Sequence, residues 1–233
     1  MRTTRALAAT VALLVGMLGS EVVLPQQTSV LLSYAPPMRG APATRLGGGT
    51  RGTSDAPDAL AVLAPEHTGL TTSGQPSLVW YAGQPITVPV EITVVDPDAI
   101  DPTLAVTLSP PIEPGVHVVD LAARGVTLEP DREYQWFVAM VLDPAQRSRD
   151  VVAGAAVRRV AESPELRARL ATTRGVGRAA AYATAGIWYD AVAELTTMIT
   201  AAPSDPSPRE ARASLLEQVG LEDVARHDRT TSR

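Results

Sequence analysis

The stretch LEPDREYQWFVAMVLDPAQRSRD, which covers residues 128–150 of this 233-residue chain, contains its best candidate strand and a charged turn directly after it. Strand side chains alternate between two faces, and apolar or aromatic residues follow that alternation here. One face would carry Tyr134, Trp136, Val138, Met140 and Leu142, and the other Phe137 and Val141. The pattern predicts a strand that is central in its sheet and covered on both faces.

The residues before this strand add a second signal. A leucine, a proline-containing turn and a tyrosine follow one another at Leu128, Pro130 and Tyr134. Immunoglobulin-like and fibronectin-like sandwiches enter their penultimate strand in this way, with the tyrosine hydroxyl bonded to an upstream backbone group. The alternative is that Tyr134 is a core aromatic residue whose hydroxyl lies at the rim. Trp136 is expected in the core in either case.

The charged turn after the strand has two interpretations. Pro144 favours a turn, Asp143 can accept hydrogen bonds from nearby backbone amides, and Arg147 offers a planar fork to Asp143 or Asp150. The first interpretation is a hairpin turn held by an ion pair. The second is a small-ligand site at the end of a sandwich, where binding loops usually lie, with Arg51, Asp143, Arg147 and Asp150 as its side chains.

Residues 59–160 show two-residue periodicity punctuated by proline and glycine. About seven short strands at this spacing favour an antiparallel β-sandwich, and a small closed barrel is the alternative. Residues 65–75 are expected to form a loop. Pro89 interrupts an alternating run over residues 86–94 and removes a backbone donor, so this strand is expected at a sheet edge or with a bulge.

The periodicity changes at Ala161. Ser163-Pro164-Glu165 is a helix start, and helices are expected over residues 164–172, 178–184, 186–199 and 209–219. Residues 181–191 with a later proline look like one tetratricopeptide-type hairpin. Such a unit cannot bury its own face, so the helical domain, residues 161–226, should dock on the sandwich and give an α+β fold. The expected contacts are Ile187, Trp188, Val192 and Leu195. Core packing is the first interpretation of Trp188, and an exposed partner-binding aromatic is the alternative. A disordered tail is expected over residues 227–233.

The amino-terminal region predicts export. Residues 1–20 combine Arg2 and Arg5 with an apolar run and a small-residue end, which is typical of a secretory signal peptide. An uncleaved amino-terminal anchor is the alternative, and no stable membrane span is expected after cleavage. Residues 21–58 form a linker rich in proline and glycine. The protein is therefore expected in the periplasm or outside the cell, and the absence of cysteine excludes disulfides there.

No motif indicates catalysis, a metal or a cofactor. The chain has three histidines, none at metal-ligand spacing, and lacks a serine-hydrolase elbow. Gly47–Gly52 matches the letters of a dinucleotide fingerprint without its strand and helix. Asp96, Asp98 and Asp101 could form a calcium loop, although a solvated turn is the stronger interpretation. The net charge of −5 argues against nucleic acid.

With these residues together, the chain resembles the bacterial family called domain of unknown function 928, found largely in cyanobacteria. The resemblance covers most of the expected mature chain in order. It rests on the motifs Gly47–Gly52, Leu70–Thr72 with Trp80-Tyr81, Tyr134–Trp136 through Asp143, Arg147, Ser148 and Asp150, Gly186–Ala191 including Trp188 and Asp190, and Val219–Leu221. It implies an exported protein with no assigned activity.

The resemblance also implies two cysteines that this chain lacks, one near residues 53–57 and one at the position of Leu142. Joint loss of two cysteines is what a lost disulfide would leave behind. This suggests that the glycine loop packs beside the end of the central strand, close to Leu142 and Asp143.

Three functions remain open. The first is a non-enzymatic cell-envelope protein that presents a surface to an envelope or secretion-related protein partner. The second is a sandwich that binds a carbohydrate or small ligand at the charged turn. The third is a hydrolase, which would need an exposed carboxylate pair in a cleft.

Overall fold

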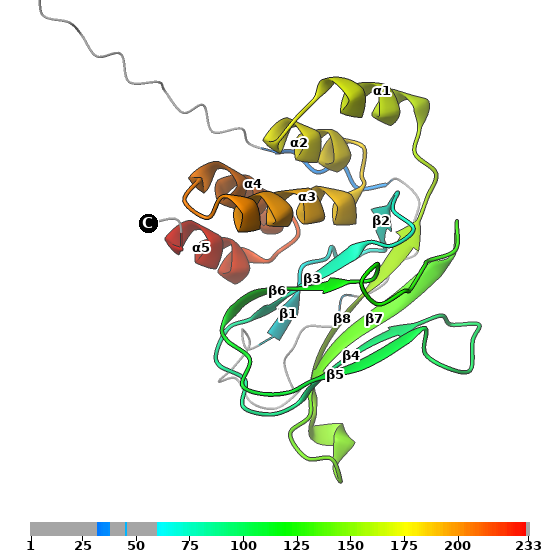
Figure 1. Cartoon of the computed structure of the whole chain (residues 1–233), viewed down its shortest axis with the longest axis vertical. Coiled ribbons are helices and arrows are strands. Elements are labelled where there is room, and N and C mark those ends of the chain that lie inside the picture. The colour runs from blue at the N-terminus through cyan, green and yellow to red at the C-terminus, as the bar shows by residue number, and fades with distance from the viewer. Residues whose placement is uncertain (1–31, 38–44, 46–59, 232–233) are drawn as a thin grey trace, which may run out of the picture.

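The computed structural model describes residues 32–37, 45 and 60–231. Within these residues the chain is a mixed α+β protein with two sheets and five helices (Figure 1). The α+β class is as the sequence predicts, whereas only four of the helices were expected. The helices gather at one end of the molecule and the strands extend away from them. In the part of the chain that the structure describes, no helix is long and apolar enough to cross a membrane.

The larger sheet has five strands in the order β2-β8-β7-β4-β5. Four of them pair antiparallel, whereas β2 runs parallel to β8. Their bounds are Gly69–Thr71 for β2, Val151–Arg159 for β8, Glu133–Met140 for β7, Val90–Val95 for β4 and Leu104–Leu108 for β5. The predicted central strand is β7, which lies between β8 and β4 and is therefore central as expected.

Only one face of β7 is covered. Tyr134, Trp136 and Val138 are buried, but Gln135 on the opposite face is exposed and Phe137 is half-buried. The prediction that both faces are covered is therefore wrong. Phe137 lies instead across Gly154 of the neighbouring strand β8, where an added Cβ would come within 2.4 Å of its ring. The Phe137 ring therefore packs on the neighbouring strand of the same sheet rather than against a second layer.

The interpretation of Tyr134 as a corner residue is confirmed in its key contact. The backbone N–H of Glu129 donates a hydrogen bond to the Tyr134 hydroxyl over 3.2 Å. The turn between the two residues contains Asp131 with a positive φ of 59°, which is uncommon outside glycine. The hydroxyl therefore fastens this turn to the start of β7.

The strand around Pro89 differs from the prediction. Strand β4 begins at Val90, directly after the proline, and it lies between β7 and β5 rather than at an edge. Because the proline stays outside the strand, no ladder hydrogen bond is lost. Its carbonyl accepts a hydrogen bond from the Val141 N–H at 2.9 Å. The predicted loop over residues 65–75 also differs, since it contains the short strand β2.

The smaller sheet is antiparallel in the order β1-β3-β6. Its strands are β1 (Leu60–Val62), β3 (Ser77–Ala82) and β6 (Gly115–Asp120). Trp80 of this sheet and Trp136 of the larger sheet are both fully buried in one hydrophobic core. That core also contains residues from the helices, so sheets and helices stabilise one another.

Five helices follow the strands. They are α1 (Pro164–Thr172), α2 (Val176–Thr184), α3 (Trp188–Ala201), α4 (Pro206–Glu217) and α5 (Glu222–Thr230). The predicted helix start is confirmed, because the Ser163 hydroxyl accepts a hydrogen bond from the Leu166 N–H at 3.1 Å. Helix α3 packs against β2 and β3. The four predicted contacts, Ile187, Trp188, Val192 and Leu195, are all buried.

The expected disordered tail is the clearest correction. Residues 227–230 form the last turn of α5 instead. Asp228 is buried and accepts two hydrogen bonds from Arg212 of α4, at 2.6 and 2.7 Å. Arg212 also donates to the Thr196 hydroxyl of α3 at 2.8 Å. A bidentate buried pair of this kind holds α5 on its neighbours and explains why a polar sequence remains helical.

Candidate functional site

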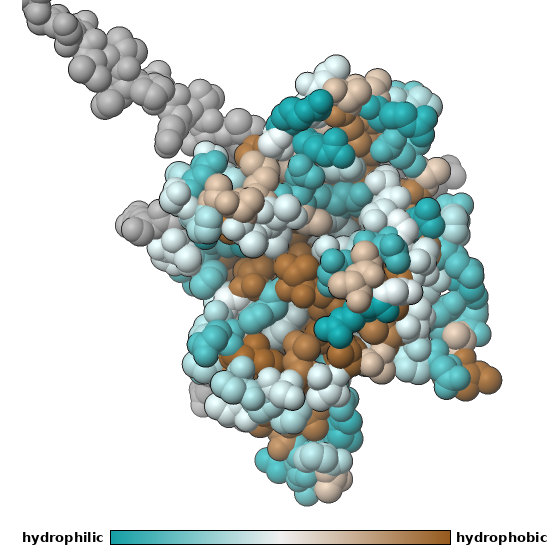
Figure 2. Space-filling model, viewed as in Figure 1, coloured by the Kyte–Doolittle hydropathy of each residue, from teal (hydrophilic) through white to brown (hydrophobic). Residues whose placement is uncertain are grey.

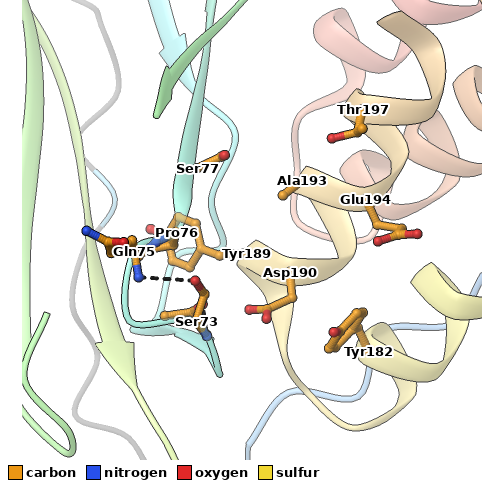
Figure 3. A pocket seen from close by; sticks show the side chains of 11 residues that line it. Ser73, Gln75, Pro76, Ser77, Tyr182, Tyr189, Asp190, Ala193, Glu194 and Thr197 are labelled. Atoms are coloured by element: carbon orange, nitrogen blue, oxygen red, sulfur yellow. Dashed lines mark hydrogen bonds between the residues drawn. The ribbon is translucent and has the colours of Figure 1, made fainter. Parts of the chain in front are cut away.

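An open cleft of about 200 Å³ lies between α3 and the loop that joins β2 to β3 (Figure 3). The loop, the start of β3, one face of α3 and one tyrosine of α2 form its walls. Its lining residues are Thr71, Ser73, Gln75, Pro76, Ser77, Tyr182, Tyr189, Asp190, Ala193, Glu194 and Thr197. Most of them carry hydroxyl, amide or carboxylate groups, so the cleft is mainly polar. Figure 2 shows apolar side chains gathered in the hollow between the helices and the strands.

The first turn of α3 is held on the sheets by two buried aromatic residues. The Trp188 indole N–H donates to the Leu63 carbonyl at 2.8 Å. The Tyr189 hydroxyl accepts from the Trp136 indole N–H at 2.8 Å and donates to the Ala156 carbonyl at 3.0 Å. Each bond satisfies a polar group that would otherwise be buried without a partner. The cleft wall formed by α3 is therefore fixed in position.

Close approach of Tyr189 depends on a glycine in β2. An added Cβ at Gly69 would come within 2.6 Å of the Tyr189 ring, which is closer than side chains tolerate. Burial raises the pKa of the Tyr189 hydroxyl, and the hydrogen bond from Trp136 acts in the opposite direction. The hydroxyl is thus kept protonated and available to donate to Ala156.

Asp190 joins the helix to the loop at the mouth of the cleft. Its carboxylate accepts from the Thr72 N–H at 3.1 Å and from the Thr72 hydroxyl at 2.7 Å. Burial raises the pKa of Asp190, whereas hydrogen bonds from Thr71 and Thr72 lower it. Each carboxylate oxygen therefore has a partner, and Asp190 acts as a staple between α3 and the β2–β3 loop.

The second carboxylate of the cleft lies one helical turn further along α3. Glu194 forms an ion pair with Arg178 of α2, with 3.5 Å between nitrogen and oxygen. Arg178 also donates to the Tyr182 hydroxyl at 3.2 Å and lies 5.6 Å from the centre of its ring. Burial raises the pKa of Tyr182, and the negative charge of Asp190 adds to this.

The remaining lining groups are uncharged. Ser73, Ser77 and Thr197 offer hydroxyls that can donate and accept, and Gln75 offers an amide. In Figure 3 the Ser77 and Thr197 hydroxyls are seen on opposite walls of the gap. The volume is below the roughly 300–1,000 Å³ of pockets for drug-sized ligands. The cleft therefore suits one small polar group, such as a side chain or a single sugar unit.

The charged turn after β7 lies at the opposite end of the molecule from α3 (Figure 1). Arg147 forms ion pairs with Asp150 at 2.7 Å and with Glu91 of β4 at 2.6 Å. Asp143 accepts a hydrogen bond from the Ala145 N–H at 2.9 Å. The fourth predicted member, Arg51, lies outside the described residues. Arg147 and Asp150 are thus paired with one another, which is the contact expected from a hairpin turn held by an ion pair. Asp143 accepts its hydrogen bond from within the same turn.

The predicted loop of aspartates is organised by a single arginine. Arg132 forms ion pairs with Asp96 at 2.9 Å, Asp98 at 3.1 Å and Glu129 at 3.0 Å. Among the described residues, no group of three or more histidines, cysteines or carboxylates is placed to hold a metal ion. Two of the three aspartates, Asp96 and Asp98, are thus paired with Arg132.

The hypothesis about the lost cysteines concerns residues 52–57, which lie outside the described part of the chain, as does Gly47–Gly52. Of the residues expected to be structural, Tyr134, Trp136 and Trp188 are buried. Asp190 links α3 to Thr72 through hydrogen bonds and also lines the cleft. Sequence reasoning did not find Ser73, Gln75 and Ser77, because hydroxyl and amide residues in a short loop carry no signal of what faces them.

A family model described as Domain of Unknown Function (DUF928) matches residues 46–229. This span includes both sheets, every residue of the cleft and helices α1 to α4, and it ends one residue before the end of α5. No curated protein matches the chain.

Proposed function

The chain belongs to the DUF928 family, and we propose that this member is an exported cell-envelope protein that binds a protein partner without catalysing a reaction. Export is supported by the basic start and apolar run of residues 1–20, which have the order of a secretory signal. The absence of cysteine from all 233 residues is compatible with that destination, since nothing there would depend on disulfide formation.

The observation that carries this proposal is the engagement of the carboxylates in the cleft. Hydrolysis by two carboxylates needs groups that are free to exchange protons with a substrate. Both oxygens of Asp190 already accept hydrogen bonds from Thr72, and Glu194 is paired with Arg178. A rigid polar cleft with occupied carboxylates supports recognition rather than acid–base chemistry.

The partner would insert one polar side chain between Ser77 and Thr197. The hydroxyls there accept and donate, and the nearby carboxylates favour a donor-rich or cationic group. On α3 the lining residues Asp190, Ala193 and Glu194 are half-buried and Thr197 is exposed, so the partner would contact a helix face as well as the loop. The small volume predicts a modest, specific contact within a wider interface.

A single sugar unit is the second candidate ligand. Two tyrosines, an amide and several hydroxyls line the cleft, and such groups offer a planar apolar surface together with bonds to sugar hydroxyls. This moves the carbohydrate hypothesis from the charged turn, where Arg147 is already paired, to the opposite end of the molecule.

We also propose finer structural kinships for the two parts of the chain. The sandwich is proposed as immunoglobulin-like, which is supported by the corner bond between Tyr134 and Glu129. The pair α2 and α3 is proposed as a tetratricopeptide-like hairpin, which is supported by its short connection and its docked inner face.

The test is a matched pair of arginine substitutions on α3. Thr197 lines the cleft and is exposed, so Thr197→Arg fills the cleft without disturbing the core. Ala201→Arg places the same charge at the exposed end of the same helix, outside the lining. Each full-length chain is produced with its signal, cross-linked in envelope preparations and captured. Residues 1–20 direct the chain there if the export proposal holds.

We expect a partner to be captured equally by the wild type and by Ala201→Arg, and at least tenfold less by Thr197→Arg. Equal capture by all three chains would show that the cleft is not the binding surface. The sugar candidate is separated by titrating neutral monosaccharides into wild type and Thr197→Arg during thermal unfolding. Stabilisation of the wild type alone would favour the sugar over the protein partner.

A further inference from the structure

Residues 32–37 lie in an extended conformation against the helices and far in sequence from everything that holds them (Figure 1, blue segment beside α2 and α3). The Ala35 N–H donates to the Ala183 carbonyl of α2 at 3.1 Å. The Tyr34 N–H donates to the Gln218 side-chain oxygen at 2.9 Å. The Gln218 amide nitrogen in turn donates to the Leu32 carbonyl at 2.7 Å. One glutamine side chain therefore binds the backbone of this segment on both sides of Ser33.

The side chains of the segment alternate between the protein and solvent. Leu32 and Tyr34 are 3% and 8% exposed, whereas Ser33 and Ala35 are exposed. The Tyr34 ring meets Trp188 edge-on with 4.8 Å between ring centres. Its hydroxyl is hydrogen-bonded to Nε2 of His67 at 2.8 Å. Leu32 and Tyr34 are thus two buried anchors, two residues apart.

The wall of the groove leaves space for a backbone. Gly186 has a φ of +77°, and an added Cβ there would come within 2.8 Å of the Ala35 carbonyl oxygen. A side chain at position 186 would therefore push the segment away. Fixed polar groups that bind the backbone, with pockets for alternate side chains, are the features by which proteins recognise extended peptides.

From these contacts we infer that the groove formed by α2, α4 and His67 is a recognition site for an extended peptide with leucine two residues before tyrosine. Residues 32–37 are its resident intramolecular ligand. The groups that hold the segment lie 33 to 186 positions away along the chain, so a free peptide would meet the same groups. The same segment presented by a second copy of the chain has the matching chemistry. This site is separate from the cleft and does not depend on the function proposed for it.

Because residues 32–37 of the same chain occupy the groove, an added peptide must compete with them. A tethered ligand acts at an effective concentration of about millimolar, so a free peptide competes poorly with it. Removal of the two anchors by Leu32→Ser and Tyr34→Ser in the full-length chain should free the groove. The probe is a fluorescent peptide of residues 30–39, and its control is the same peptide with both serines introduced.

We expect the probe to bind the doubly substituted chain at least tenfold more tightly than the wild type, measured by fluorescence anisotropy. The control peptide should show no saturable binding. Addition of Gln218→Ala to the doubly substituted chain should weaken probe binding at least fivefold, because the backbone contacts are lost. Gln146→Ala, at an exposed glutamine far from the groove, should leave it unchanged. Equal affinity of the folded double variant for probe and control peptides would overturn the inference.

A milder variant covers the case in which the double substitution prevents folding. Tyr34→Phe keeps the aromatic anchor and removes only the hydrogen bond to His67. We expect the full-length Tyr34→Phe chain to bind the probe several-fold more tightly than the wild type. No difference between these two chains, with probe at millimolar concentration, would identify the segment as a fixed part of the core.

Discussion

The joint of α3 with the sheets and the turn between β7 and β8 use polar side chains in opposite ways. At the joint, Trp188, Tyr189 and Asp190 make hydrogen bonds to three separate parts of the β region, at Leu63, at Trp136 with Ala156, and at Thr72. At the turn, Arg147 is half-exposed and joins Glu91 at the surface, and it also pairs with Asp150, whose side chain is only 5% exposed. The joint carries one charged residue, whereas the turn is densely charged.

The contrast shows that density of charge in a sequence is a poor guide to where polar groups matter most. A buried hydrogen bond that loses one partner leaves the other without water, so each such bond has a large effect on stability. An exposed ion pair competes with water and salt, and its net contribution is small. The joint should therefore determine stability and the shape of the cleft, while the exposed Arg147–Glu91 pair of the turn should contribute little to stability.

The strongest test of this contrast is Trp188→Ala. The substitution removes a fully buried ring, its bond to Leu63 and its edge contact with Tyr34. We expect the free energy of unfolding to fall by about 3–5 kcal/mol, as for other large aromatic residues in cores. Urea denaturation followed by circular dichroism measures the change.

Trp188→Phe is the control for the hydrogen bond alone. It retains much of the packing but leaves the Leu63 carbonyl without its donor, so the loss should be smaller, about 1–3 kcal/mol. If Trp188→Ala cost less than 1 kcal/mol, the helices would not depend on the joint, and the comparison between the two regions would fail.

The sequence predicted the strands and helices because their signals are local. Alternation around Trp136 identified β7 and its buried face, and Ser163 with Pro164 marked the start of α1. Errors arose where a distant partner changes the outcome. Phe137 was expected beneath a second layer but lies on Gly154, and α5 was missed because Asp228 depends on Arg212 of another helix.

The candidate site could be predicted only in part. Trp188 and its neighbours were expected to dock on the sheets, and this followed from the single apolar face of one helical hairpin. The pairing of Asp190 with Thr72 spans 118 positions and leaves no periodic signal in either segment. The charged turn attracted attention because arginine and aspartate are conspicuous, although Arg147 satisfies its neighbours within the turn and on β4.

Asp190 offers a second test, in which the effect depends on pH. Burial raises the pKa of this carboxyl in the folded protein above its ordinary value. Between the unfolded and folded pKa values the folded state holds the proton more tightly, so the stability contributed by Asp190 increases as pH falls and is lost as pH rises. Asp190→Asn should abolish this part of the pH dependence. Unfolding free energies of both chains between pH 4 and about 8 measure it.

Asp190→Ala is the matched control. Asparagine can accept from the Thr72 N–H and donate to its hydroxyl, whereas alanine leaves the Thr72 N–H without an acceptor. We expect Asp190→Asn to stay close to the wild type at neutral pH and Asp190→Ala to lose about 1–2 kcal/mol. Equal losses in both variants would assign the role to the charge of Asp190 rather than to its hydrogen bonds.

The smallest effect is expected at the turn, from Glu91→Gln. Arg147 would lose one charged partner but keep Asp150, and the guanidinium is exposed to water throughout. We expect the urea midpoint to change by little more than the error of measurement. Any change should fade as salt rises, because at physiological ionic strength charges are screened over about 8 Å. A salt-independent loss as large as that of Asp190→Ala would mean that the turn and the joint contribute alike. The charged turn would then again be a candidate functional site.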